Sequence, residues 1–282
     1  MDELIVTRHE SPEGFLAASE QLLMLAEAEN NLMLGIAQGL VRNPQPERSI
    51  YLATVGSRTG IHACAVHIAP FKLVVTRADR KAITALAKDA HAAIPNLEGV
   101  TGPASSSSDF AVAWSQLSGT EPVLAMRLRI YETRKVVEDD LPKPRGIFRP
   151  AGLADLDRLT AWTKDFVREA KIADRVDAAQ IVADSINRGR LHVWEDGEPV
   201  SMAAWTGKTP NGVRINFVYT PRDQRGKGYA TACVSALTKQ QLEQGCEFCW
   251  LYTDLSSTAS PKIFKRIGYW PVSDVAEYYL KR

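Results

Sequence analysis

One short stretch, Arg225-Gly226-Lys227-Gly228-Tyr229-Ala230, constrains the fold of this chain more than any other. It follows residues 213–219, which alternate in the manner of a β-strand, and it opens residues 229–244, where apolar side chains recur at helical intervals. Gly226 and Gly228 can adopt backbone angles closed to other residues, which leaves successive N–H groups free to point at one anion at a helix N-terminus. The stretch therefore predicts a strand, a glycine loop and a helix that together bind a phosphate or pyrophosphate.

Several kinds of phosphate site share this order of elements, and the residues beside the glycines distinguish them. A Walker loop needs Ser or Thr after Gly-Lys to hold magnesium, whereas Lys227 is followed by Gly228 and Tyr229. A dinucleotide-binding loop accepts Ala230 as its third small residue, but the spacing Gly-x-Gly-x-Ala is one residue too short. Taken alone, the two glycines also fit an ordinary turn.

Neighbouring segments supply a more specific resemblance. The segments that carry it are residues 218–221 (Val-Tyr-Thr-Pro), 224–230 (Gln-Arg-Gly-Lys-Gly-Tyr-Ala), 251–255 (Leu-Tyr-Thr-Asp-Leu) and 262–269 (Lys-Ile-Phe-Lys-Arg-Ile-Gly-Tyr). Together they resemble the acetyl-CoA-binding half of a GNAT N-acyltransferase, with the closest likeness to the glycine N-acyltransferase-like branch. Arg225, Gly228 and Ala230 match the R/Q-x-x-G-x-G/A signature of that superfamily, and the resemblance runs from about residue 146 to the C-terminus.

The resemblance implies an α/β (α+β) fold with a mixed, mostly antiparallel sheet flanked by helices. It also implies direct transfer of an acetyl group from acetyl-CoA, as co-substrate, to a small amine, without a metal. The residues expected to contact the coenzyme are Phe217, Val218, Tyr219, Arg225, Gly226, Lys227, Gly228, Tyr229, Ala230, Ser257 and Phe264. In the resembled family, a backbone N–H near Val218 would polarise the thioester carbonyl.

The chain departs from the family pattern where side chains carry the chemistry. Phe264 stands where the resemblance predicts a tyrosine acid for the leaving thiol, so Tyr252 and Tyr269 are the candidate substitutes, although both also fit a strand aromatic.

Two further departures concern the base and the pantetheine arm. Arg214 occupies the position of a strand glutamate base; it cannot act as a base, but it could hold a substrate carboxylate or be a surface cation. Glu169 is the remaining candidate base, and its alternative role is a solvated helix carboxylate. Ser257 replaces an asparagine that bonds the pantetheine arm in relatives.

Composition restricts the partners. Lys plus Arg number 34 and Asp plus Glu number 33, so the balance of charge gives no reason to expect nucleic acid or an anionic membrane. We find no secretory signal or apolar membrane span, and we expect a cytoplasmic monomer or homodimer. The four cysteines do not make a disulfide framework and are expected to be reduced, and Cys246-x-x-Cys249 has no second pair at metal spacing.

The 282 residues are expected to form two domains with one order of elements, as in a tandem of GNAT-like domains. The expected division is a degenerate GNAT-like domain over residues 1–137, a proline-bearing linker over 138–146, and an acetyl-CoA-binding domain over 147–282. The first half has no glycine between Val75 and its next helix, so we expect coenzyme binding only in the second half.

Periodicity gives the expected elements. Helices are expected at 14–41, 79–93, 105–117, 153–170, 178–188, 229–244 and 259–266, and strands at 50–55, 61–68, 71–77, 97–101, 123–131, 191–194, 200–205, 213–219, 246–254 and from 269 onward. The expected function is an N-acyltransferase. The alternative is a coenzyme-binding regulatory protein, or a catalytically weak relative, that kept the phosphate loop.

Overall fold

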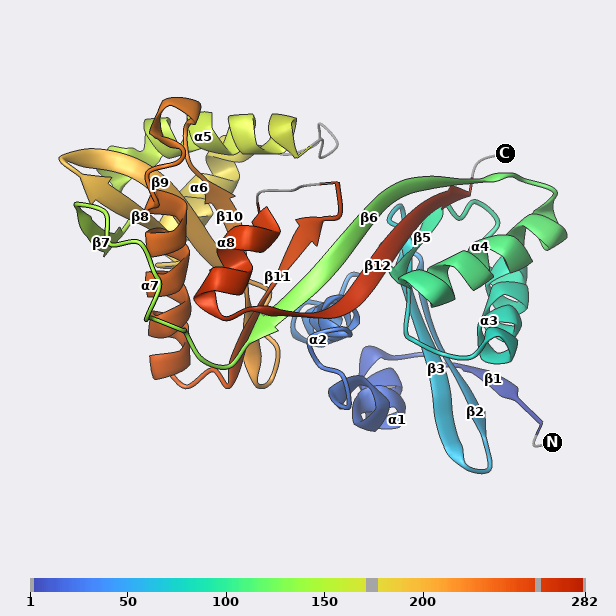
Figure 1. Ribbon diagram of the computed structural model, residues 1–282. Helices are drawn as coiled ribbons and strands as arrows, with labels where there is room; N and C mark the ends of the chain where they lie inside the picture. The colour runs from blue at the N-terminus through green and yellow to red at the C-terminus, as the bar shows by residue number, and fades with distance from the viewer. Residues whose placement is uncertain (1–2, 171–176, 257–259, 281–282) are drawn as a thin grey trace. The chain divides into compact units, whose positions relative to one another are not determined.

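The protein forms two compact units in a computed structural model that describes residues 3–170, 177–256 and 260–280 (Figure 1). The first unit comprises Met1–Ile130, Asp254–Ser256 and Val272–Arg282, and the second comprises Tyr131–Thr253 and Ser257–Pro271. Each unit combines strands of one mixed sheet with helices packed on it, so the predicted α/β fold class is confirmed.

The first unit is built around a sheet with strand order β1-β2-β3-β4-β5-β12-β6. Its elements are β1 (Ile5–Arg8), α1 (Pro12–Met24), α2 (Asn31–Arg42), β2 (Ile50–Ser57), β3 (Gly60–Ile68), β4 (Leu73–Val75), α3 (Arg80–Ala93), β5 (Gly99–Pro103), α4 (Ala104–Ser118), and most of β6 (Pro122–Thr133) and β12 (Trp270–Leu280). The pair β4–β5 is parallel, whereas β1–β2, β2–β3, β3–β4 and β5–β12 are antiparallel.

The second unit carries the glycine loop. Its elements are β7 (Ile147–Pro150), the short 3₁₀ helix η1 (Leu153–Asp155), α5 (Leu156–Glu169), α6 (Ala178–Asn187), β8 (Leu191–Asp196), β9 (Glu198–Thr206), β10 (Gly212–Tyr219), the 3₁₀ helix η2 (Arg222–Gln224), α7 (Tyr229–Glu243), β11 (Phe248–Asp254) and α8 (Ser260–Ile267). The strand order is β11-β10-β9-β8-β7, with β10 and β11 parallel and the other pairs antiparallel.

Side chains of β10 reach both helical layers. Val213 and Ile215 join a buried cluster with Leu237 of α7, whereas Phe217 and Tyr219 pack in a cluster with helices α5 and α6. Figure 1 shows α7 and α8 on one side of this sheet and α5 with α6 on the other. These four residues of β10 are two apart and would share one face of a regular strand, so the register shift near the end of β10 moves the later two to the other face.

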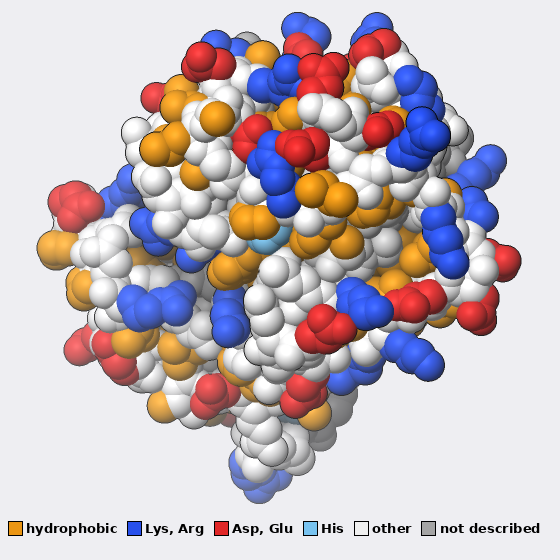
Figure 2. All heavy atoms as spheres, turned by 90° about the vertical axis from the view of Figure 1, so that its left-hand side faces the viewer, with side chains coloured by type: hydrophobic (Ala, Val, Ile, Leu, Met, Phe, Trp, Pro, Cys, Tyr) orange, Lys and Arg blue, Asp and Glu red, His pale blue; other side chains and the backbone are white. Residues whose placement is uncertain are grey.

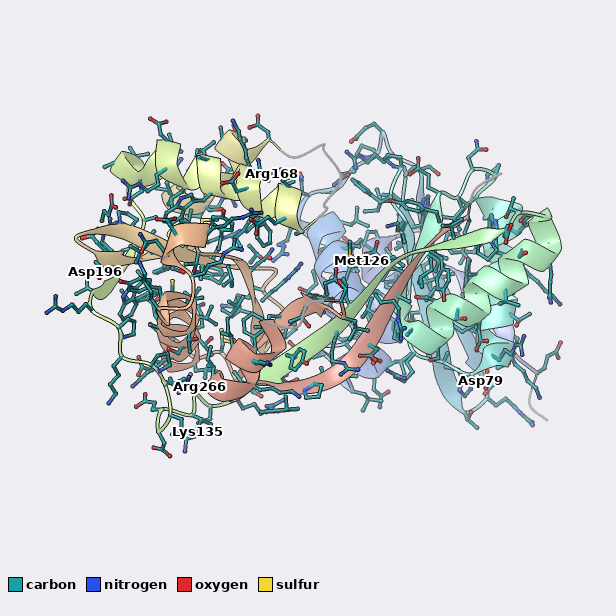
Figure 3. All side chains as sticks on the ribbon, turned by 45° about the horizontal axis from the view of Figure 1, so that its top comes forward. Asp79, Met126, Lys135, Arg168, Asp196 and Arg266 are labelled. Carbon is teal, nitrogen blue, oxygen red and sulfur yellow. The ribbon has the colours of Figure 1, made fainter. Side chains whose placement is uncertain are left out.

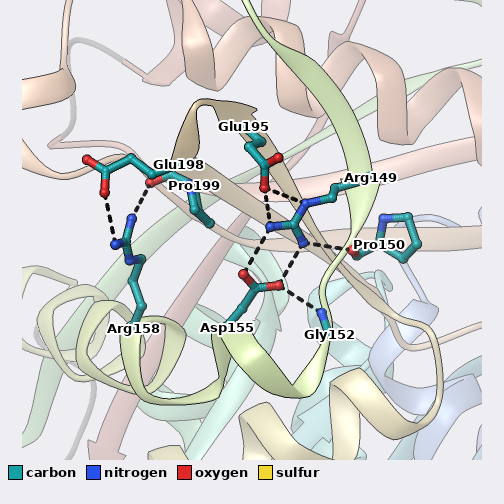
Figure 4. A network of polar contacts seen from close by, with 8 residues as sticks. All are labelled: Arg149, Pro150, Gly152, Asp155, Arg158, Glu195, Glu198 and Pro199. Atoms are coloured by element: carbon teal, nitrogen blue, oxygen red, sulfur yellow. Dashed lines mark hydrogen bonds and ion pairs between the residues drawn. The ribbon is translucent and has the colours of Figure 1, made fainter.

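The start of α5 is fixed by Arg149 on the edge strand β7 (Figure 4). Its guanidinium donates to both carboxylate oxygens of Asp155, at 2.7 and 3.0 Å, and to Glu195 of β8, while Asp155 also accepts the Gly152 N–H at 2.8 Å. The guanidinium holds the pKa of the Asp155 carboxyl below its usual range. The network therefore joins β7, β8 and the N-terminus of α5, the helix that packs against β10.

The observed elements agree closely with the expected ones, with three differences. The helical region expected over residues 14–41 is two helices, because the side-chain amides of Asn30 and Asn31 donate to the carbonyls of Leu23 and Ala28 and end the first helix. The strand expected at 71–77 is shorter, and β1 and β7, of four residues each, were not anticipated.

The compact units also differ from the expected division into residues 1–137 and 147–282. The C-terminal strand β12 belongs to the first unit, where it pairs with β5 in antiparallel register, with Tyr279 opposite Gly99. Lys72 and Glu277 form an ion pair within the same unit. Residues 131–146, including the expected linker, group with the second unit, where Val137 donates a backbone hydrogen bond to Ile267.

A substitution at Gly99 tests the place of β12. A Cβ atom on Gly99 would lie 2.3 Å from the Tyr278 carbonyl oxygen, so Gly99→Val should force the β5–β12 ladder apart and lower the free energy of unfolding by about 1–3 kcal/mol. Gly35→Ala on α2 is the control, since a Cβ there meets no atom within 4 Å. The measurement is urea denaturation, and a Gly99→Val midpoint equal to that of the unsubstituted protein would contradict the pairing.

Candidate functional site

The site begins where β10 leaves its two neighbours. The parallel ladder with β11 ends at the pair Arg214–Trp250, and the antiparallel register with β9 shifts between Asn216 and Tyr219. Phe217 inside this bulge has a φ of 49°, the only positive φ outside glycine among the described residues. A bulge leaves backbone groups without ladder partners, so this end of β10 can offer N–H and C=O groups to a ligand.

Aromatic side chains on α5 hold the bulge. The rings of Phe217 and Phe166 lie 5.5 Å apart, and those of Tyr219 and Trp162 lie 6.2 Å apart. Such ring pairs add roughly 0.5–1.5 kcal/mol each beyond burial, which offsets a left-handed backbone cost of roughly 1–3 kcal/mol at Phe217.

The glycine loop follows directly. Gly226 and Gly228 have φ values of 79° and 88°, so both occupy the left-handed region that other residues avoid. The first hydrogen bond of α7 joins the Ala232 N–H to the Gly228 carbonyl, at 3.0 Å. The N–H groups of the preceding first turn therefore have no intrahelical acceptor, and Gly228 as N-cap offers no side chain to fill that role. The geometry fits an anion-binding nest.

The side chain of Arg225 links the glycine loop to neighbouring elements. Its Nε donates to the Thr220 carbonyl at 2.9 Å, its Nη2 donates to Glu169 at 2.7 Å, and its guanidinium carbon lies 5.6 Å from the centre of the Tyr219 ring. The side chain thus ties the loop to the end of β10 and to α5. Sequence reasoning placed Arg225 on the coenzyme, whereas its guanidinium is engaged with the protein.

Other predicted loop residues differ in their exposure. Lys227 is exposed and donates to Gln224 at 2.8 Å, so its charge stays at the mouth of the loop. Tyr229 points away, because its hydroxyl donates at 2.7 Å to Asp196 at the β8–β9 turn. Pro142 lies against Gly228, where an added Cβ would approach its ring to 2.8 Å. The segment expected as a linker is therefore part of the loop's surroundings.

Glu169, the predicted base, is a structural partner of two arginines. Its carboxylate accepts from Arg225 and, at 3.2 Å, from Arg222. These hydrogen bonds hold the pKa of Glu169 below its usual range. A carboxylate with a lowered pKa is a weaker proton acceptor, so the geometry accounts for Glu169 as a brace and leaves its catalytic role a prediction.

The residues considered as proton donors to the leaving thiolate lie in different environments. Phe264 is buried on α8 and meets Tyr269 edge to face, with ring centres 6.0 Å apart. The Tyr269 hydroxyl is enclosed with that of Thr238, at 2.7 Å, and burial raises its pKa well above the usual value. Tyr269 is therefore a core residue. Tyr252 of β11 is half-buried beneath the guanidinium of Arg214, whose carbon lies 4.6 Å from the ring centre.

Arg214 stands at the last paired position between β10 and β11. Its Nε is buried and forms no hydrogen bond with any described residue, and burial lowers the pKa of its guanidinium. The structure thus brings Arg214 and Tyr252 together.

A buried histidine of β8 lies outside the site, and Ser257, expected to contact the coenzyme, lies outside the description. His192 is buried against Phe148, with ring centres 4.9 Å apart, and burial lowers its pKa. It has the environment of a core histidine. Ser257 lies outside the described residues.

The corresponding turn in the first unit is built differently. There α3 begins at Asp79, whose carboxylate accepts the Ala82 N–H at 2.8 Å; Figure 3 labels this residue. A carboxylate fills the helix N-terminus and would repel a phosphate. The expectation of no amide nest in this half agrees with that arrangement.

Sequence reasoning missed several residues that shape the site. Phe166 and Trp162 support the bulge, Asp196 holds Tyr229, and Pro142 lies against Gly228. Aromatic residues four apart on an amphipathic helix were the only available signal, and that pattern is common to many packed helices.

Charges around the second unit are mixed. Figure 2 shows Lys and Arg interspersed with Asp and Glu over the face on the left of Figure 1. Among the residues that the structure describes, no group of three or more His, Cys, Asp or Glu could hold a metal ion. No described helix is long and apolar enough to cross a membrane.

The ion pairs of Glu169 predict a pH-dependent contribution to stability. Because its pKa in the folded protein is below the ordinary 4.5, the contribution is present above pH 4.5 and is lost as the pH falls through the folded pKa. At pH 7, Glu169→Gln should cost less than about 1 kcal/mol, since the pair is partly exposed, and this difference should vanish in acid. Thermal unfolding from about pH 3 to about pH 7, the range in which carboxylates titrate, measures the difference in stability between the variant and the unsubstituted protein. Glu20→Gln at an exposed position of α1 is the control. A constant difference across that range would contradict the assignment.

Comparisons with known proteins show which family and which solved structures this chain resembles. Residues 156–269, which include β10, the glycine loop, α7 and α8, match the acetyltransferase (GNAT) family. Comparison with the curated proteins finds no match. Among solved structures, a GNAT-family acetyltransferase from Colwellia psychrerythraea is 12% identical, with a TM-score of 0.58 and coverage of 98% of this chain and 100% of that chain.

Two further structures agree in fold. A GCN5-related N-acetyltransferase from Kribbella flavida is 16% identical, with a TM-score of 0.58, and the match covers 88% of this chain and 93% of that one. A tandem GNAT protein from the clavulanic acid biosynthesis pathway is 10% identical, with a TM-score of 0.56 and coverage of 99% of both chains. The chain therefore has the GNAT fold, and the part of it that matches the GNAT acetyltransferase family is residues 156–269.

Proposed function

We propose that this protein is an acyl-CoA-dependent N-acyltransferase that moves an acetyl group from acetyl-CoA to a small amine. One observation carries the proposal: an uncapped helix N-terminus with two left-handed glycines directly follows a bulged strand, within the segment that matches the GNAT family. The N–H groups of the loop suit a pyrophosphate, and the bulge suits an extended amide-bearing arm that needs backbone partners.

The proposed roles follow from position. Gly226, Gly228 and the first turn of α7 would hold the pyrophosphate, with exposed Lys227 adding positive charge. The backbone of Phe217–Tyr219 would align the pantetheine arm, with an N–H near Val218 polarising the thioester carbonyl. Arg225 would act through the protein, by keeping the loop in the conformation that binds.

The proposed reaction is direct attack. The lone pair of the neutral amine forms a C–N bond to the thioester carbon, and collapse of the tetrahedral intermediate breaks the C–S bond and releases a thiolate. The amine loses one proton, and the thiolate gains one. Holding the two reactants together accounts for a large share of the rate, because oriented reactants can gain roughly 7–11 kcal/mol over free ones.

Tyr252 is the proposed proton donor to the thiolate. It lies on β11 just past the point where β10 and β11 stop pairing, whereas Phe264 has no hydroxyl and that of Tyr269 is enclosed with Thr238. Glu169 stays the proposed acceptor of the amine proton. Its lowered pKa makes it a weak base, so the acceptor must enter largely as the free amine.

A second candidate function is favoured by Phe264. A buried phenyl ring at the position where the family resemblance predicts an acid fits a protein that binds the coenzyme and transfers the acyl group slowly or not at all. Such a protein would use coenzyme binding for regulation. Both functions depend on the same loop.

Calorimetric titration with acetyl-CoA tests that shared dependence. Gly228→Val should weaken binding at least about tenfold, because the left-handed backbone disfavours a β-branched residue and the side chain would meet Pro142. Gly245→Val is the matched control: its φ is 98° with open space around it, at the far end of α7.

Because Gly228→Val could impair folding, Gly226→Ala serves as a milder second variant. Its φ is 79° and a Cβ there meets no atom within 4 Å, so only the backbone is strained. Unchanged affinity in both folded variants would contradict the loop assignment.

A thiol-release assay over an amine panel separates the two candidate functions. We expect acceptor-dependent release, and we expect Phe264→Tyr to raise turnover by up to about 10²-fold if a missing acid limits the rate. Tyr269→Phe, which removes only the buried contact with Thr238, is the control for adding or removing a hydroxyl nearby. Tight binding of acetyl-CoA without acceptor-dependent release would favour the regulatory protein.

A further inference from the structure

Arg214 is an unusual arginine for its place in the fold. It lies on β10 at the last position that pairs with β11, and beyond it β10 pairs with β9. Its side chain is on the face opposite to the α7 cluster, because its neighbours Val213 and Ile215 pack in that cluster. Its guanidinium lies over the ring of Tyr252, the β11 residue just beyond the paired positions.

The guanidinium has no anionic partner in the described part of the second unit. Several other arginines of this unit are paired: Arg149 with Asp155 and Glu195, Arg158 with Glu198, and Arg225 with Glu169. Arg214 forms no ion pair with a described residue, and its buried Nε donates to none of them. Arg214 is half-buried, so its charge is partly shielded from water, and a ring face satisfies only part of that charge.

A second orphaned donor lies beside it. Trp250, the register partner of Arg214 on β11, is fully buried, and its indole N–H also has no acceptor among the described residues. Paired residues of neighbouring strands point to the same face. Two donors on adjacent strands therefore lack acceptors at the point where β10 and β11 separate.

The position of Arg214 relative to the bulge fits an acceptor substrate. Four residues separate it from Val218, which is about 13 Å along a strand. A long arginine side chain and a small molecule can together span that distance. The planar guanidinium presents parallel donors that match a carboxylate, a match that the rounded ammonium of lysine lacks.

We infer that the amine acceptor carries a carboxylate, as an amino acid does, and that Arg214 binds this carboxylate while the amino group faces the thioester. The inference rests on the proposed transferase function and adds the chemical class of the acceptor. Tyr252 supports the guanidinium from its ring face, so the cation is oriented before the substrate arrives. The carboxylate supplies the acceptor that Nε lacks.

Matched pairs of acceptors test this. Glycine and methylamine, alanine and ethylamine, and phenylalanine and phenethylamine differ by the carboxylate, and each pair is assayed by thiol release from acetyl-CoA. We expect the amino acids to be the better substrates. Arg214→Met should raise their KM by roughly 10- to 100-fold with a smaller change in kcat, and Arg214→Lys should lie between. The variants should leave the KM of the plain amines unchanged.

Arg190 provides the matched control. Its Nε is also buried without an acceptor, and its guanidinium lies 5.1 Å from the ring centre of Trp205, yet Trp205 packs on the α7 side of the sheet. Arg190→Met removes a similar stacked cation on the face of the sheet opposite to Arg214, and it should leave the KM for amino acids unchanged. Equal effects of the two variants would mean that loss of a stacked arginine, and not of a substrate contact, is measured, which would overturn the inference.

A binding measurement separates failure of this inference from failure of the proposed function. The CoA-bound protein is titrated calorimetrically with the same three amino acids and three amines. Amino acid binding that Arg214→Met abolishes upholds the carboxylate site even if no thiol is released. Acetylation of the plain amines that is as efficient as that of the amino acids, in protein with and without Arg214→Met, overturns the site and leaves the transferase standing. Absence of both binding and release overturns both.

Discussion

The candidate site depends on a single break in β-sheet pairing. If β10 paired along its whole length, its N–H and C=O groups would all be hydrogen-bonded to β9 and β11, and none would be free to bind a ligand. At β10 the register shifts between Asn216 and Tyr219, with Phe217 in a left-handed conformation. Phe166 and Trp162 of α5 stabilise that conformation, because their rings pack against those of Phe217 and Tyr219. The Arg149 network, which fixes the start of α5, is therefore part of what keeps the strand open.

The arginines near this break serve two different purposes, and their partners reveal which. Arg225 has a carboxylate, a carbonyl and a ring as partners, so its Nε and Nη2 are engaged with the protein and hold the loop. Arg214 has a ring alone. Close partners are needed to offset the desolvation of a charge. Arg225 already has such partners within the fold, whereas the guanidinium of Arg214 would gain one from a ligand carboxylate.

Local signals predicted the strand, the loop and the helix of the second unit, because alternation in 213–219, two glycines and helical spacing after Tyr229 are all read within a few residues. Long-range features left no such signal. The pairing of β12 with β5 joins residues near 275 to residues near 103, and an alternating strand fits many edges equally well. Glu169 looked like a solvated helix carboxylate, and its ion pair with Arg225 across 56 residues could not be read from either segment. Nothing in the residue type of Phe217 predicts a positive φ.

The two units show how one position decides whether a strand–loop–helix unit can bind an anion. Both α3 and α7 begin with N–H groups that need an acceptor. In the first unit Asp79 supplies one from within the chain, which stabilises α3 and adds a negative charge at its start. In the second unit Gly228 supplies none, and both Gly226 and Gly228 have a left-handed backbone. The second arrangement gives up the stability of a side-chain cap, which a bound phosphate would recover under the proposed function. The same exchange would hold at Arg214, where the carboxylate of the proposed acceptor would satisfy a donor that the fold leaves without a partner. Arg214 lies on β10 and the glycine loop follows β10 in the chain, so both proposed binding groups belong to the strand whose pairing is interrupted.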